Sequence, residues 1–254
     1  MADDDGDGEG FRGARFTGRD FTGARFDDCD LRGVKVVDSW LVDVNISGLI
    51  GNLVVNDVEV TAFVEAELDR RHPERVQVRA MRTAEDHRAT WDTLERLWAE
   101  AVAQVRRLPE AVRQERVDEE WSFVETLRHL VFCTDAWASR TVLDDPMPYH
   151  RLGYCHSSYP RADAVALGID LDARPSFDEV LEVRADRMAV IRGIVDALTD
   201  DELQRSCDRS PAPGYPDETR TVGACLRVVM VEECEHHRYA VRDLAILEAR
   251  QRPA

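Results

Sequence analysis

The chain has 254 residues, of which 44% are hydrophobic, so it can form one large domain or two ordinary ones with a buried core. Its formal net charge of −17 argues against binding to nucleic acid or to an anionic membrane through a basic face. It has no run of 18 apolar residues, no basic-then-apolar N-terminus and, among its six cysteines, no CxxC pair, which together predict a cytoplasmic protein with reduced thiols.

The N-terminal part of the chain has a period of five residues. Residues 1–10 are acidic and glycine-rich and predict a disordered tail. From there on a large apolar residue recurs at every fifth position: Phe11, Phe16, Phe21, Phe26, Leu31, Val36, Leu41 and Ile46. Because a period of five fits neither a helix nor a flat strand, this region is an internal repeat.

This run resembles the pentapeptide-repeat family. The resemblance implies a right-handed, four-sided β-helix over residues 11–60, with the Phe and Leu side chains stacked inside. Four units make one coil in that family, so the run provides about two coils. A stack this short needs caps at its ends. An amphipathic segment that begins near Val60 and ends at His72-Pro73 predicts a linking helix within residues 61–82.

From Thr83 onward the apolar residues recur with helical spacing. Thr83 is a predicted N-cap, and Ser176 with Glu179 forms a predicted capping box. Four helices with long connections predict a four-helix bundle over residues 83–254, and an α+β chain as a whole. The expected long helices cover residues 83–107, 122–143, 176–198 and 221–248.

The last predicted helix carries two charged or polar residues on its apolar face. The stripe reads Leu226, Met230, Glu233, His237, Ala240, Leu244 and Leu247. An unpaired carboxylate in a core is costly, and a metal ion is one partner that removes the cost. Glu233 and His237 lie one turn apart and are therefore predicted metal ligands, although a buried ion pair or a surface contact would have the same spacing.

A second register has the same spacing. Glu232 and His236 are also four residues apart, on a stripe that includes Tyr239 and Asp243. This stripe is more polar and is interpreted as the solvated one, so we prefer Glu233 and His237.

A third ligand is predicted on the second helix of the bundle. His129 lies between apolar neighbours, one turn before Cys133. Together with Glu233 and His237 it provides two imidazoles and one carboxylate. Three protein ligands with an open fourth position describe a catalytic divalent-metal site.

The helical part resembles the DinB-like superfamily of metal-binding four-helix proteins. The shared marks are a histidine early in the second helix, here His129, and a pair of donors with spacing four in the last helix. In the mycothiol-dependent branch the first donor of that pair is a glutamate, as in Glu233-x-x-x-His237. The resemblance implies a bound divalent ion, zinc or nickel, and transfer or isomerisation chemistry with a small thiol as co-substrate. Isomerases of that branch tend to have a further histidine where this chain has Ala240, so the resemblance does not extend to an isomerase assignment.

Weaker candidates for substrate binding surround the predicted ligands. They lie in the proline- and tyrosine-rich loop at 146–160 or near the last ligand, where arginines suit a carboxylate. Ordinary packing and salt bridges are the alternatives for all of them. These candidates are Cys133, His150, Tyr154, His156, Arg238 and Arg242.

These features predict a small-molecule enzyme: a metal-dependent thiol transferase or detoxification enzyme in which the ion activates a thiolate or water. Ferrous oxygenase chemistry also suits such ligands but has no other support in the chain. The alternative is a non-catalytic metal-binding or interaction protein that uses the repeats as a scaffold or as a homodimer surface. DNA mimicry by the repeats is disfavoured because Arg12, Arg15, Arg19, Arg25, Arg32 and Lys35 make them locally basic.

Overall fold

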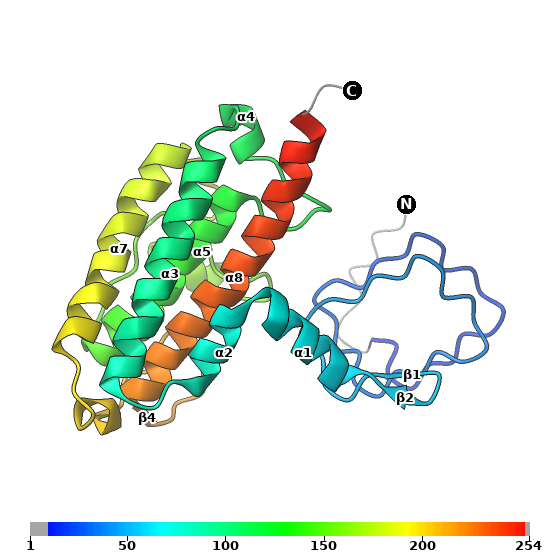
Figure 1. Cartoon of the computed structure of the whole chain (residues 1–254), viewed down its shortest axis with the longest axis horizontal. Helices are drawn as coiled ribbons and strands as arrows, with labels where there is room; N and C mark the ends of the chain where they lie inside the picture. Colours follow the sequence, from blue (N-terminus) through cyan, green and yellow to red (C-terminus); the bar gives the residue numbers. More distant parts are fainter. Residues whose placement is uncertain (1–9, 252–254) are drawn as a thin grey trace. The chain divides into compact units, whose positions relative to one another are not determined.

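The computed structural model describes residues 10–251 (Figure 1). Apart from Gly10, the expected disordered tail lies outside the described residues. The chain divides into two compact units, Met1–Val44 and Asn45–Ala254. The first unit carries most of the five-residue repeats and the second carries all of the helices.

The repeat unit is built from turns that recur along the chain. The backbone N–H of Ala14 donates to the carbonyl oxygen of Phe11 at 2.9 Å, and that of Ala24 donates to Phe21 at the same distance. Gly13 and Gly23, inside these turns, have φ angles of 74° and 76°, which favour glycine. The structure assigns no strand within residues 10–50, so the repeats are present as turns without a regular β-ladder.

A hairpin and two short helices precede the bundle. Strand β1 (Val54–Val55) pairs antiparallel with β2 (Val58–Glu59). Helix α1 (Thr61–Arg71) ends before His72 as expected, but a second helix, α2 (Pro73–Ala80), begins at the very next residue. The proline that ends the first helix starts the second one, because proline at the first helical position loses no backbone hydrogen bond.

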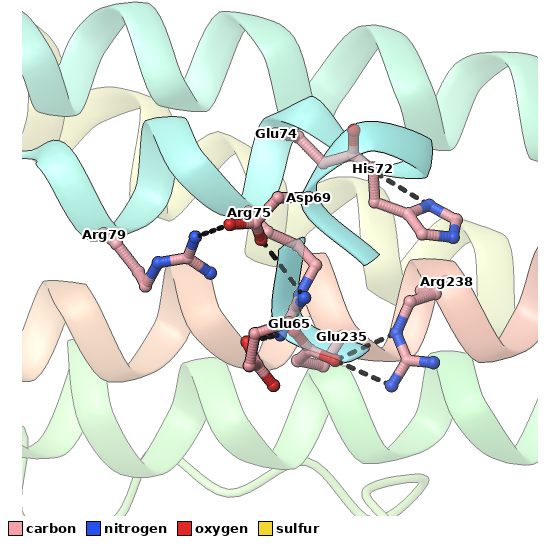
Figure 2. Close-up of polar contacts among 8 residues, drawn as sticks. All are labelled: Glu65, Asp69, His72, Glu74, Arg75, Arg79, Glu235 and Arg238. Atoms are coloured by element: carbon pink, nitrogen blue, oxygen red, sulfur yellow. Dashed lines mark hydrogen bonds and ion pairs between the residues drawn. The ribbon is translucent and has the colours of Figure 1, made fainter. Parts of the chain in front are cut away.

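One arginine joins this region to the last helix, α8 (Val222–Gln251). The guanidinium of Arg75 on α2 contacts Glu65 at 3.0 Å and Asp69 at 3.2 Å, both on α1, and Glu235 on α8 at 2.9 Å. Figure 2 shows these carboxylates gathered around Arg75, with Arg238 on the other side of Glu235. The Arg75 side chain is only 10% exposed, so the network is partly shielded from solvent.

The predicted four-helix bundle is confirmed. Its long helices lie side by side in Figure 1. They are α3 (Ala84–Val105), α5 (Phe123–Thr134), α7 (Phe177–Ala197) and α8. Helix α5 continues as a π-helical segment, η1 (Asp135–Val142). The connections contain α4 (Glu110–Arg113), α6 (Arg161–Ala166), the 3₁₀ helix η2 (Glu202–Gln204) and the pair β3 (Ser206–Cys207) and β4 (Arg220–Thr221).

Local sequence defines where three of these helices begin. Thr83, Ser122 and Ser176 each accept a hydrogen bond from the backbone three residues on, and the acidic side chain at that position binds back to the cap. Such capping boxes satisfy two backbone donors at once. The box at Ser122 and Glu125 starts α5, the helix that carries His129.

The core of the bundle is apolar and closely packed. Trp91, Leu130, Ile191 and Leu226, from the four long helices, have no exposed surface. No helix within the described part of the chain combines the length and the apolar character needed to span a membrane.

Candidate metal centre

Helices α5 and α8 bring a cluster of metal-ligating side chains together. The Nε2 atom of His129 lies 3.2 Å from the thiol sulfur of Cys133 and 3.4 Å from Oε2 of Glu232. The same Glu232 oxygen lies 3.1 Å from Nε2 of His236. Ligands of a tetrahedral zinc ion lie about 3.3–3.8 Å apart when the metal–ligand bonds have ordinary lengths. The donor atoms of His129, Cys133 and Glu232 all lie within 4.8 Å of one another, so these three are close to the spacing that one ion requires.

A hydrogen bond at Nδ1, on the side of the ring away from Glu232, holds the imidazole of His129 in one orientation. Its Nδ1–H donates to the carbonyl oxygen of Tyr154 at 2.9 Å, because a carbonyl can only accept. Tyr154 is fixed in turn by its backbone N–H, which donates to the carbonyl oxygen of Arg128. This arrangement leaves the lone pair of Nε2 facing Glu232, as in metal sites where a second hydrogen bond orients the ligating ring.

Further bonds hold the loop that supplies Tyr154. The Arg128 guanidinium donates to the carbonyl oxygens of Leu152 and Asp170, each at 2.9 Å, and lies 5.0 Å from the centre of the Tyr154 ring. Because Arg128 is buried and donates hydrogen bonds to these backbone carbonyls, it fixes the backbone of the loop. The loop is therefore part of the scaffold around His129.

The second imidazole of the cluster is stacked on a tryptophan. The rings of His236 and Trp121 are 5.7 Å apart and inclined by only 17°. Trp121 also lies 4.7 Å from His129, and the two imidazoles are themselves 4.7 Å apart. Trp121 forms one wall of the cluster and limits how far either imidazole can turn.

The electrostatics of the cluster fit a cation. Burial lowers the pKa of His129, so its neutral form dominates near pH 7 and its Nε2 is an acceptor. Burial by itself would raise the pKa of Glu232, but the neighbouring imidazoles of His129 and His236 outweigh burial and hold this pKa far below its usual range. A carboxylate oxygen and the lone pair of a neutral imidazole thus face each other. A cation between these two acceptors removes their electrostatic repulsion.

Cys133 is a further donor of the cluster and is also buried. Burial raises the pKa of its thiol well above the ordinary value, and the nearby carboxylates of Glu232 and Glu233 raise it further. Without a cation this cysteine is therefore a neutral thiol. It becomes a thiolate ligand only if a metal ion displaces its proton.

Glu233, the preferred glutamate of the sequence analysis, does not join His129. It is fully buried, as its stripe predicted, but its carboxylate forms an ion pair with Arg184 of α7. The cost of burying this charge is thus met by a guanidinium on a neighbouring helix. The cluster around His129 contains Glu232 instead.

His237 is likewise buried on the other stripe of α8. Its ring packs edge-on against Trp98 of α3, with the two ring centres 5.2 Å apart. Burial lowers its pKa, so it is a neutral core imidazole. The structure therefore places His129 with Glu232 and His236, the register that the sequence analysis ranked second.

The loop candidates have structural partners. The backbone N–H of His150 donates to Asp135, and its Nδ1 accepts from the backbone N–H of Leu152. His156 lies 3.0 Å from the hydroxyl of Ser158 and packs against Tyr159. Tyr154 touches the cluster, through its backbone carbonyl and through its ring, which lies 5.6 Å from Trp121.

The two arginine candidates on α8 are engaged in ion pairs. Arg238 pairs with Glu235 at 2.9 Å, and its guanidinium lies over the ring of Tyr239. Arg242 pairs with Glu120 at 2.6 Å and with Asp243 at 2.7 Å. Both contacts match the salt-bridge alternative of the sequence analysis.

The sequence analysis singles out neither Trp121, which packs on the cluster, nor Arg184, which pairs with Glu233. Trp121 directly precedes the N-cap Ser122, a position where an apolar residue usually packs on its own helix. Arg184 lies on α7 among residues of helical spacing, and a buried charge there leaves no periodic signal. Trp121 could have been noticed in the sequence, because it directly precedes a capping box.

Two protein-family models match this chain. The family model for the DinB superfamily matches residues 93–240, and the model for pentapeptide repeats matches eight copies in residues 11–48. No curated protein matches the chain. A crystal structure of a Streptococcus pneumoniae protein from a structural genomics programme is similar, with 17% identity and a TM-score of 0.47 over 70% of this chain and 98% of that one. The match over more than half of its residues shows that the chain belongs to the DinB superfamily, with pentapeptide repeats at its N-terminal end.

Proposed function

We propose that this protein is a divalent-metal-dependent enzyme that transfers a small thiol to an electrophilic substrate. The observation that supports this is the contact of one Glu232 carboxylate oxygen with two imidazoles, at 3.4 Å from Nε2 of His129 and 3.1 Å from Nε2 of His236. Two imidazoles and one carboxylate form the three-ligand set of catalytic zinc sites, and the same donors suit nickel.

The residues of the chain have distinct tasks in this proposal. His129, fixed by Tyr154, presents a neutral nitrogen, and Glu232 supplies one negative charge to the cation. A bound divalent cation lowers the pKa of a thiol or water ligand and so provides a nucleophile at neutral pH. Substrates reach the site from the side of Glu232, whose side chain is 33% exposed.

The proposed reaction is a substitution at carbon. The thiol loses its proton to solvent, and the sulfur forms a new bond to the electrophilic carbon. The leaving group departs with the bonding electron pair, so neither partner is oxidised or reduced. Trp121 and the loop that carries Tyr154 are the surfaces available to position both substrates.

For the N-terminal repeats we propose a four-sided β-helical stack that serves as a scaffold. The turns recur with the required spacing, and the phenylalanine rings of successive units meet at 5.5 Å and 5.4 Å.

A non-catalytic metal site is the second candidate, and Cys133 favours it. With its sulfur 3.2 Å from His129 Nε2, the cysteine can complete a set of four protein ligands. Four protein ligands close a zinc site and leave no position for a substrate. The coordination of Cys133 therefore separates an enzyme from a structural metalloprotein.

The first test is the metal content of the untagged protein after dialysis, measured by elemental analysis. We expect about one equivalent of zinc or nickel, and its loss in Glu232→Ala and His236→Ala. The matched controls are Glu233→Gln and His237→Ala, one residue further along the same helix, which should retain the metal. Metal retained in the first pair and lost in the second would overturn the assignment of the ligands.

The second test separates the two functions. In the cobalt-substituted protein, a sulfur-to-cobalt charge-transfer band that vanishes in Cys133→Ser identifies Cys133 as a ligand and supports the structural site. An enzyme should lack this band until a small thiol is added, and should then consume that thiol when an alkylating electrophile is present. A bound metal with no thiol-dependent change in the cobalt spectrum would contradict the transferase proposal.

A further inference from the structure

A cavity of the helical unit lies where α8 begins. Its volume is about 520 Å³, and cavities of this size commonly hold small molecules. The lining includes Met81, Arg82, His87, Leu203, Arg227 and Val228. These residues come from the connection between α2 and α3, from α3, from η2 and from α8. The lining and the metal centre have no residue in common, so this is a separate place on the molecule, which we call the α8 cavity.

Part of the lining is apolar. Leu203 of η2 and the side chains of Val228 and Val231 of α8 contribute to it. Gly223 allows η2 to lie directly on α8, because a Cβ atom at this position would come within 3.2 Å of the carbonyl oxygen of Leu203. Val231 is 40% exposed, so this apolar surface is open to solvent. A ligand with an apolar body would remove it from water.

One buried imidazole in the lining has an unused nitrogen. His87 is only 3% exposed. Its Nδ1–H donates to the carbonyl oxygen of Thr83 at 2.8 Å, because a carbonyl can only accept. Burial lowers the pKa of His87, so the ring is neutral and its Nε2 is an acceptor. This buried Nε2 has no hydrogen-bond partner within residues 10–251. Such an acceptor favours a ligand with an O–H or N–H donor.

Two arginines in the lining lack an anion. The guanidinium groups of Arg82 and Arg227 both donate to the carbonyl oxygen of Met81. Arg227 also donates to the carbonyl oxygen of Val78 at 2.7 Å. Burial lowers the pKa of Arg227, and the like charge of Arg82 lowers it further. No carboxylate of the described residues forms an ion pair with either guanidinium. A carboxylate from a ligand would suit both of them.

The first turn of α8 adds to this positive charge. A helix carries a partial positive charge at its N-terminus, where backbone N–H groups have no partner within the helix. The hydroxyl of Thr221 accepts from one of them, the N–H of Ala224, at 3.2 Å. The whole chain has a net charge of −17, yet Arg82, Arg227 and this helix end place positive charge together. The α8 cavity therefore favours an anion.

We propose that the α8 cavity binds a small apolar carboxylic acid that also carries a hydroxyl group. The carboxylate pairs with Arg82 and Arg227, and the apolar body covers Leu203 and Val228. The hydroxyl group donates to Nε2 of His87. An amine would also donate, but its charge would add a third cation beside the two guanidinium groups, so we favour a hydroxyl.

Isothermal titration calorimetry of the full-length protein with the ortho, meta and para isomers of hydroxyphenylacetate tests the proposal. We expect saturable binding of at least one isomer. Phenylacetate, which lacks the hydroxyl group, should bind about threefold to tenfold more weakly. The matching hydroxyphenylethanol, which lacks the carboxylate, should bind at least about tenfold more weakly. These comparisons use the unaltered chain, so they do not depend on the folding of a variant. Failure of all the isomers to bind would overturn the proposal.

Variants locate the acid in the α8 cavity, after circular dichroism has verified that each is folded. Arg82→Met and Arg227→Met should each raise the Kd at least about tenfold. The matched control is Arg238→Met, which should leave the Kd unchanged, because Arg238 is on the same helix but already pairs with Glu235. In His87→Phe the preference for the hydroxyl group should disappear, while phenylacetate binds as before.

A carboxylate can also bind a metal ion, so one further variant separates the two sites. Glu232→Ala removes a proposed ligand of the metal centre and should leave the Kd of the acid unchanged. An affinity that is lost in Glu232→Ala but kept in Arg82→Met and Arg227→Met would overturn the proposal and assign the acid to the metal centre.

Discussion

The two units of this chain use apolar residues in opposite ways. In the repeat unit every residue from Gly10 to Val44 is exposed, including the phenylalanines that define the period. In the helical unit Trp91, Leu94 and Leu130 are fully buried by partners from distant parts of the chain. Periodicity thus indicates which face of an element is apolar. It does not indicate which other element covers that face, because the partner comes from a distant part of the sequence.

The largest expected effect contrasts two tryptophans. Trp91→Ala should lower the free energy of unfolding of the helical unit by about 3–5 kcal/mol, because it leaves a cavity in the core. Trp40→Ala, in the repeat unit, should change it by less than about 0.5 kcal/mol. Urea denaturation followed by helical circular dichroism measures both. Equal effects would mean that the two units unfold as one.

A smaller effect concerns the ion pair behind the metal centre. Arg184→Met leaves Glu233 buried without a partner and should cost about 3 kcal/mol. The double variant Arg184→Met with Glu233→Leu removes both charges and should recover most of this loss. If the double variant were less stable than the single one, the ion pair would stabilise the fold by more than the neutralisation of two buried charges.

The smallest effect concerns the start of α5. The carboxylate of Glu125 accepts from the backbone N–H of Ser122 and from Arg116, and Glu125→Gln should cost about 1 kcal/mol at pH 7. Burial would raise the pKa of Glu125, but the hydrogen bonds from Arg116 and from the cap outweigh burial and lower this pKa below its ordinary value.

This shift in pKa sets the sign of the pH dependence. The folded protein keeps Glu125 ionised to lower pH than the unfolded chain does, so its contribution is present above pH 4.5 and is lost as pH falls below that value. The difference in stability between the wild type and Glu125→Gln should therefore shrink in acid. A difference that stays constant down to pH 3 would show that ionisation of Glu125 does not support the cap.

Much of the helical unit is predictable from the sequence because its signals are local. Thr83 and Ser176 begin helices as their capping patterns predict, and His129 lies in the cluster as expected. Helix α2 was missed because a proline was interpreted only as an end. The resemblance to the DinB superfamily is confirmed by the family match.

Which residues of α8 lie beside His129 was harder to predict, for a physical reason. The apolar stripe correctly indicated that Glu233 is buried, but its partner is Arg184 on another helix, which no pattern within α8 reveals. The stripe of Glu232 and His236 was interpreted as solvated because it is polar. Glu232 and His236 nevertheless lie beside the buried His129, so a polar stripe can also mark a face that meets a buried histidine.

The network around Arg75 has a consequence for dissecting the protein. A fragment that starts at Thr83, where helical periodicity becomes continuous, would lose Arg75 and leave Arg238 as the sole cation recorded at Glu235 (Figure 2). Glu235 lies on α8 between Glu232 and His236, so this cut would disturb the helix that carries both side chains. A fragment that begins at α1, near Thr61, would instead keep Arg75 together with Glu65, Asp69 and Glu235.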